Sequence, residues 1–159
     1  MRLSTKGRYA VMALADLASH SPDQTKPVSL ADIATRQEIS LSYLEQLFGK
    51  LRKGGLVKSV RGPGGGYRLS REGSGIRVSD IVMAVDEPIK ATRCRPGSPS
   101  GCHIDRGRCL THDLWEELGN QIYLYLSSVS LADVCEQRVL GTSGETHRRE
   151  QPDQTAAAE

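Results

Sequence analysis

Residues 29–69 carry two capped helical patterns and a glycine-rich hairpin in direct succession, and this order restricts the fold more than any other feature of the chain. Ser29 precedes LADIATRQ, with Asp32 three residues later, and Ser40 precedes LSYLEQLFGKLRK, which two glycines follow. Serine at such positions caps a helix, and glycine ends one. Two capped helices joined by a turn of about three residues predict a helix-turn-helix over about 30–53.

The segment that follows predicts a β-hairpin over about 56–70. LVKSV and YRLS have the composition of short strands, and GPGGG between them is typical of a turn. A hairpin directly after a helix-turn-helix indicates the wing of a winged helix. The tip, including Gly64, bears almost no side chains, so its backbone can approach another molecule closely. Arg61 precedes the tip, where a guanidinium could enter the minor groove of DNA.

The outward face of the second helix of this motif predicts contacts with nucleic acid. It carries small, amide and cationic side chains: Ser42, Tyr43, Gln46, Lys50 and Lys53, with Glu45 beside them. Such groups can hydrogen-bond base edges and bind phosphates, although the same pattern also suits the solvated side of a surface helix. Charge favours the first interpretation. Residues 1–70 hold 11 Lys and Arg against 5 Asp and Glu, or +6, whereas residues 71–159 hold 10 against 14, or −4.

The rest of the chain predicts a mainly α fold. Only 4% of its residues are aromatic, so the core must be aliphatic, which favours helices. Residues 5–19 predict a first helix with Asp16 off its apolar face, followed by a loop over 20–28. Residues 78–85 predict a short helix packed under the DNA-binding domain. A secretory signal and a run of about 20 apolar residues are both lacking, so we expect a cytoplasmic protein without a membrane span.

Three of the four cysteines fall between residues 93 and 115 in the pattern C-x7-C-x6-C-x2-H, formed by Cys94, Cys102, Cys109 and His112. The gaps are rich in Gly, Pro and Ser, and a metal could order such a loop. Thiolates and an imidazole suit zinc or an iron–sulfur centre. The loose spacing favours iron and sulfur, while zinc and a disulfide stay open as alternatives. His103 and Cys135 are weaker candidates, and Cys135 is expected to be a packed thiol.

A long helical pattern follows the cysteines and ends near residue 129. Its wide apolar stripe has little of the chain left to cover it, which predicts pairing with a second subunit, with folding back onto its own domain as the alternative. The stripe consists of Leu114, Trp115, Leu118, Ile122, Tyr125, Leu126 and Val129. Ser130 and Asp133 then cap a short last helix. Residues 141–159 lack apolar periodicity and are expected to be disordered.

Several of these stretches resemble one known family. MRLSTKGRYAV, SLADIATRQEISLSYLEQLFGKLRKGGLVKSVRGPGGGY, AVDEPIKATRC and CLTHDLW are similar to the IscR family of bacterial iron–sulfur cluster regulators, which are dimeric winged-helix transcription factors. The resemblance runs from Met1 to about Leu131. It implies a DNA-binding domain over 1–87, a cluster-binding loop over 88–112, and a dimerisation helix with a short terminal helix over 113–140.

The resemblance also implies roles for single residues. A [2Fe-2S] cluster would be held by Cys94, Cys102, Cys109 and His112 and supplied by the iron–sulfur assembly machinery. Double-stranded DNA operators would meet Ser40, Ser42, Tyr43, Glu45 and Gln46 in the major groove and Arg61 in the minor groove. Glu45 matches the residue that discriminates two classes of operator. The chain would then repress or activate cluster-assembly genes and would not be an enzyme. A nitric-oxide-sensing relative, a zinc-stabilised repressor and a small electron carrier are the rival interpretations.

Overall fold

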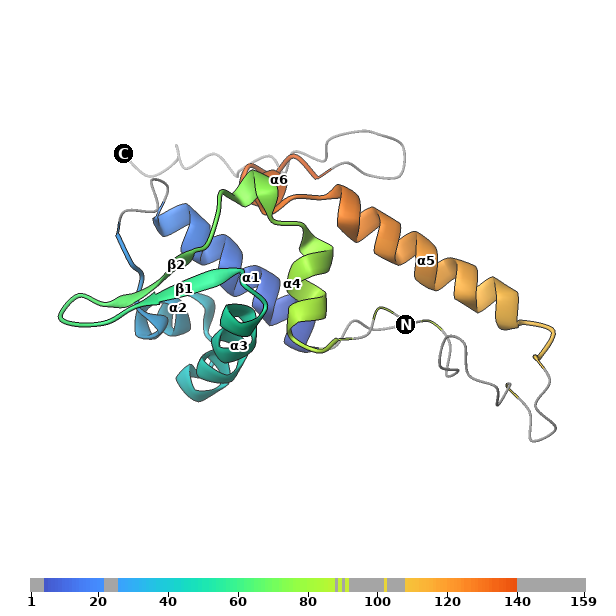
Figure 1. The fold of residues 1–159 in the computed structure, drawn as a ribbon, viewed down its shortest axis with the longest axis horizontal. Coiled ribbons are helices and arrows are strands. Elements are labelled where there is room, and N and C mark those ends of the chain that lie inside the picture. Colours follow the sequence, from blue (N-terminus) through green and yellow to red (C-terminus); the bar gives the residue numbers. More distant parts are fainter. Residues whose placement is uncertain are drawn as a thin grey trace, which may run out of the picture.

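The computed structural model describes residues 5–21, 26–87, 89, 91, 102 and 108–139, and within them it shows a mainly helical winged helix-turn-helix (Figure 1). The elements follow in the order α1 (Thr5–His20), α2 (Leu30–Gln37), α3 (Leu41–Lys53), β1 (Val57–Val60), β2 (Gly66–Leu69), the 3-10 turn η1 (Gly73–Gly75), α4 (Val78–Ala84), α5 (His112–Ser128) and α6 (Leu131–Cys135). The predicted fold class is confirmed. The tail over 141–159 lies outside the described residues.

The helix-turn-helix is formed by α2 and α3, and both helices begin at the predicted caps. The Ser29 hydroxyl accepts a hydrogen bond from the Asp32 amide at 3.1 Å, and the Ser40 hydroxyl accepts one from the Tyr43 amide at 3.3 Å. Glu38 ends α2 with a φ of 54°, a left-handed conformation that turns the chain into α3. Leu41, the first residue of α3, is 43% exposed.

The wing is an antiparallel hairpin in which Val57 pairs with Leu69 and Val60 with Gly66. It is extended by one residue from the segment predicted to be a loop. Val28 exchanges two backbone hydrogen bonds with Tyr67, of 2.9 and 2.8 Å. This contact explains why position 66 is glycine, since a Cβ there would lie 2.2 Å from the Val28 carbonyl oxygen. The base of the wing is therefore joined to the segment that precedes α2.

The core lies between α1, α3, α4 and the base of the wing, and it is aliphatic as predicted. Phe48 is fully buried and packs edge-on against Tyr67, with ring centroids 4.9 Å apart. The other side chains that are completely buried include Leu14, Leu17, Ile33, Leu44, Leu51, Ile76, Ile81, Val85 and Leu131. Because Leu131 belongs to α6, the end of the described chain returns to the core of the DNA-binding domain.

Asp16 corrects the prediction that it lies off the buried face of α1. Its side chain is only 1% exposed and accepts three hydrogen bonds from Arg36, of 2.6 to 3.1 Å, and one from Gln37 at 2.7 Å. Burial by itself would raise the pKa of this carboxyl, but the hydrogen bonds and charge of its partners outweigh burial and hold the pKa below its ordinary value. The buried charge thus joins α1 to the end of α2.

α5 leaves the domain on the side opposite to the wing instead of folding back over it (Figure 1). Its C-terminal end is anchored by two backbone hydrogen bonds, from Val78 to Val129 at 3.0 Å and from Leu131 to Ile76 at 2.8 Å. Most of its apolar side chains face solvent: Leu114, Trp115, Tyr123, Leu124 and Tyr125. None of the helices in the described ranges combines the length and apolar character needed to cross a bilayer.

Candidate functional site

α3 presents its polar side to solvent because its apolar side is used up in the core. Leu44 and Leu47 are buried, whereas Ser42, Glu45 and Gln46 are exposed. Ser40 is exposed as well, but its hydroxyl already caps the helix. A groove-binding helix needs a solvent-facing side with varied hydrogen-bonding groups, and this side of α3 has them.

Two predicted DNA-binding residues of α3 have partners within the protein. The ring of Tyr43 is partly buried and packs edge-on against Tyr9, with centroids 6.0 Å apart. The Lys50 ammonium lies 2.9 Å from the Asp86 carboxylate, and its hydrogen bond lowers the pKa of Asp86 below the ordinary value. Asp86 therefore occupies one of the three N–H donors of Lys50 and partly neutralises its charge.

The tip of the wing depends on its glycines. Gly62 and Gly64 have φ angles of 105° and 72°, which side chains rarely adopt, and a Cβ on Gly65 would lie 2.5 Å from the Val60 carbonyl oxygen. Arg61 is exposed beside this tip. A narrow, bare hairpin with one guanidinium at its end has the shape and charge to enter a minor groove.

Three of the four predicted metal ligands, Cys102, Cys109 and His112, belong to the described residues, and two of them, Cys102 and His112, are in contact at the start of α5. His112 is the first residue of the helix and only 8% exposed, and its Nδ1 lies 3.0 Å from the Sγ of Cys102. Cys109 occupies the turn immediately before α5, where its carbonyl accepts a hydrogen bond of 3.0 Å from the His112 amide. Its Sγ lies 3.6 Å from the Thr111 hydroxyl. Cys94 and His103 lie outside the described residues.

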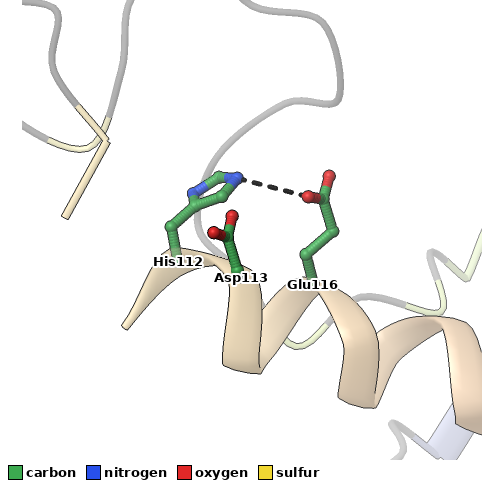
Figure 2. A group of neighbouring side chains, drawn as sticks. All are labelled: His112, Asp113 and Glu116. Atoms are coloured by element: carbon green, nitrogen blue, oxygen red, sulfur yellow. Dashed lines mark ion pairs between the residues drawn. The ribbon is translucent and has the colours of Figure 1, made fainter. Parts of the chain in front are cut away.

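The donor chemistry of this place fits an iron–sulfur centre. Thiolate sulfur and imidazole nitrogen on one metal stand roughly 3.5 Å apart, given bond lengths of about 2.3 and 2.0 Å, so Cys102 and His112 would need to separate only slightly to share one. The other ring nitrogen, Nε2, lies 3.6 Å from the Glu116 carboxylate (Figure 2). The sequence patterns did not single out Glu116, although it lies four residues after His112 on the same expected helix.

Cys135 is separate from this group. Its thiol donates a weak hydrogen bond of 3.7 Å to the Ala15 carbonyl, and burial raises its pKa above the ordinary value. A neutral, packed thiol on α6 agrees with the prediction for this residue.

Comparison with known proteins also indicates a transcriptional regulator. Residues 3–137 match the model of the family Rrf2, described as iron-dependent transcriptional regulator. The chain is 56% identical to the HTH-type transcriptional regulator IscR of Photorhabdus laumondii, over 91% of this chain and 85% of that protein. It is 50% identical to the protein of the same name from Escherichia coli O1:K1 / APEC, over 96% and 91%.

Among solved structures, IscR of T. potens superimposes with a TM-score of 0.68 at 40% identity, covering 87% of this chain and 88% of that one. CymR (YrzC), the global cysteine regulator of B. subtilis, superimposes equally well at 33% identity, covering 86% and 97%. The winged helix with its long helix is thus shared with a protein described as a global cysteine regulator as well as with an IscR.

Proposed function

Since the chain belongs to the Rrf2 family of transcriptional regulators, we propose that it senses iron–sulfur cluster supply through a [2Fe-2S] cluster at the start of α5. It is a DNA-binding transcriptional regulator of the IscR type, as its relatives show. The signal to which it responds and the way in which it senses this signal are proposed here. The observation that supports the proposed cluster site is the approach of the Cys102 thiol to the His112 imidazole.

The DNA interface consists of α3 and the wing. α3 enters the major groove and the wing reaches the neighbouring minor groove. The residues proposed for these contacts are Ser40, Ser42, Tyr43, Glu45 and Gln46 for base edges and their surroundings, Lys50 for a phosphate, and Arg61 and Gly64 for the minor-groove side. Glu45 is the acid among them, and it disfavours operators that offer it phosphate or acceptor groups instead of a cytosine amino group. As a DNA-binding protein, the regulator acts in the cytoplasm.

Cys94, Cys102, Cys109 and His112 hold the cluster. When bound, it would supply a redox-active and removable link between the cysteine loop and α5. The imidazole in place of a fourth thiolate lowers the negative charge of the site, which suits a cluster that is gained and lost. The assembly machinery is the donor.

The loop is joined to the DNA-binding domain at the end that follows α4. The Glu87 carboxylate accepts a hydrogen bond of 3.0 Å from the Gly7 amide at the start of α1, and Asp86 binds Lys50 on α3. At its other end the loop continues into α5. Cluster binding at this loop would therefore act on both the DNA-binding domain and α5.

The exposed apolar side of α5 is proposed to pair with α5 of a second copy. Trp115 and Tyr125 are 42% and 46% exposed, and Leu114 and Leu124 are 62% and 57% exposed. Apolar groups on one exposed helix are costly in water and are suited to a subunit interface. A homodimer places two copies of α3 on one side, so the orientation of α5 fixes their spacing on the operator.

The test is anaerobic purification followed by iron and sulfide analysis and by operator binding. We expect red-brown protein with two irons and two sulfides per subunit, and different operator affinities with and without the cluster. A variant with Cys94, Cys102 and Cys109 all replaced by Ala should behave as the cluster-free protein at every operator. Colourless protein that contains only zinc, or identical binding by both proteins under both conditions, contradicts the proposal.

A further inference from the structure

The two ring nitrogens of His112 face two different partners. Nδ1 lies 3.0 Å from Cys102 Sγ, and Nε2 lies 3.6 Å from Glu116 Oε2. The side chain of His112 is only 10% exposed, so the imidazole is largely shielded from bulk water. Figure 2 shows the imidazole and the Glu116 carboxylate facing each other along one side of α5.

We propose that Glu116 is a positioning residue for His112. Its carboxylate accepts the hydrogen of Nε2, which leaves the lone pair of Nδ1 directed at Cys102 and holds the ring in that orientation. This inference rests on the proposed function, because it concerns how His112 serves as a ligand. A carboxylate behind a metal-binding histidine fixes the tautomer of the ring and strengthens it as a donor. The contact needs an approach of about half an ångström to reach hydrogen-bond length.

Arg108 lies near both acids at the start of α5. Its Nη1 lies 3.4 Å from Asp113 Oδ1 and 4.0 Å from Glu116 Oε2. Because Arg108 immediately precedes Cys109, these contacts also tie the last cysteine of the loop to α5. The Arg108 guanidinium partly neutralises the charges of Asp113 and Glu116. The carboxylate of Glu116 therefore repels the nearby thiolates less strongly.

The helix dipole does not account for the position of Glu116. Asp113 lies in the first turn of α5, where a negative charge stabilises any helix through its dipole, and its side chain is 85% exposed. Glu116 lies one turn later, beyond the reach of that effect, and is 43% exposed. Among the described residues, its carboxylate pairs with the Arg108 guanidinium at 4.0 Å and with the buried imidazole at 3.6 Å.

The test compares cluster-loaded Glu116→Ala and Glu116→Gln with a matched control, Glu117→Ala. Glu117 is the next residue of α5 and is exposed, so its removal changes the same charge without touching His112. The readouts are the imidazole nitrogen coupling seen by pulsed EPR of the reduced cluster and the rate of cluster loss to a chelator. Glu116→Ala should alter the coupling and lose the cluster about tenfold faster, as for other outer-shell partners. Glu116→Gln, whose amide oxygen can still accept the hydrogen, should restore most of both.

The outcomes separate the two proposals. If wild-type protein loads no cluster, both are overturned. If wild-type protein loads and Glu116→Ala matches Glu117→Ala in coupling and rate, only the role of Glu116 is refuted. If Glu116→Ala and Glu116→Gln are equally impaired, the charge of Glu116 matters and its hydrogen bond does not, which also refutes the positioning role. Thermal unfolding of the cluster-free variants checks that each substitution leaves the fold intact.

Discussion

Replacing Asp16 with Asn tests whether the buried charge between α1 and α2 holds the helix-turn-helix in place. The carboxylate receives three hydrogen bonds from Arg36 and one from Gln37 and is 1% exposed. An asparagine keeps one accepting oxygen but turns an NH2 group towards a guanidinium that needs acceptors. Arg36 would be left with its charge only partly compensated.

The expected loss follows from the burial of the two partners. Removing one member of a fully buried pair costs roughly 3–5 kcal/mol, but Arg36 remains 33% exposed and can regain water. We therefore expect Asp16→Asn to lower the free energy of unfolding by about 2 kcal/mol. At an m-value of about 2 kcal/mol per molar urea, the unfolding midpoint falls by about 1 M. Protein concentration must be held constant, because the proposed dimer would contribute to stability.

The pH dependence gives a second, independent measure. The folded-state pKa of Asp16 lies below its ordinary value of 3.8, so its stabilisation is fully present above that value and is lost as the pH falls through the folded-state pKa. The difference between wild type and Asp16→Asn should therefore shrink below about pH 4. Asp32→Asn, an exposed acid in the first turn of α2, is the control and should cost under about 1 kcal/mol. If Asp16→Asn destabilises no more than Asp32→Asn, the reasoning is refuted.

Three further predictions concern the DNA-binding surface. Gly66→Ala should destabilise the protein by about 2 kcal/mol in urea unfolding, because its Cβ would collide with the Val28 carbonyl; an unchanged midpoint would contradict the strand contact. Arg61→Ala should weaken operator binding in fluorescence anisotropy and reduce the salt dependence of log K by about one phosphate contact, most clearly on operators with A·T-rich minor grooves. Asp86→Asn should strengthen binding to nonspecific DNA, because it releases Lys50; an unchanged affinity would show that Lys50 contacts no phosphate.

The parts of the fold that could be predicted depend on local interactions. Ser29, Ser40 and Ser130 marked the helix starts because a cap bonds an amide three residues away, a contact that lies within the sequence pattern itself. Asp16 was misplaced because its partner Arg36 lies 20 residues further on, and a helical pattern cannot indicate which polar residue has a buried partner.

The candidate site shows the same division. The long helical pattern after the cysteines predicted the helix that begins at His112, and Cys109 lies three residues before that helix. The approach of Cys102 to Nδ1 could not be predicted, because the two residues are ten apart and no helical or strand pattern in the sequence relates them. Glu116 lies four residues after His112 in the sequence. Its proposed role, however, depends on which ring nitrogen faces the Cys102 thiol, and only the structure shows this.

The geometry of α5 indicates how a change at His112 could reach DNA. The helix is fixed to the domain at Val129 and Leu131, at the end opposite to His112. Its 17 residues form an arm of about 25 Å, so a tilt of about 10° around the anchored end moves the other end by about 4 Å. α3 is packed into the core and would not change shape under such a tilt. A dimer formed through α5 would instead change the spacing of its two α3 helices, so regulation should appear as a choice between operators of different half-site geometry, with α3 itself unaltered.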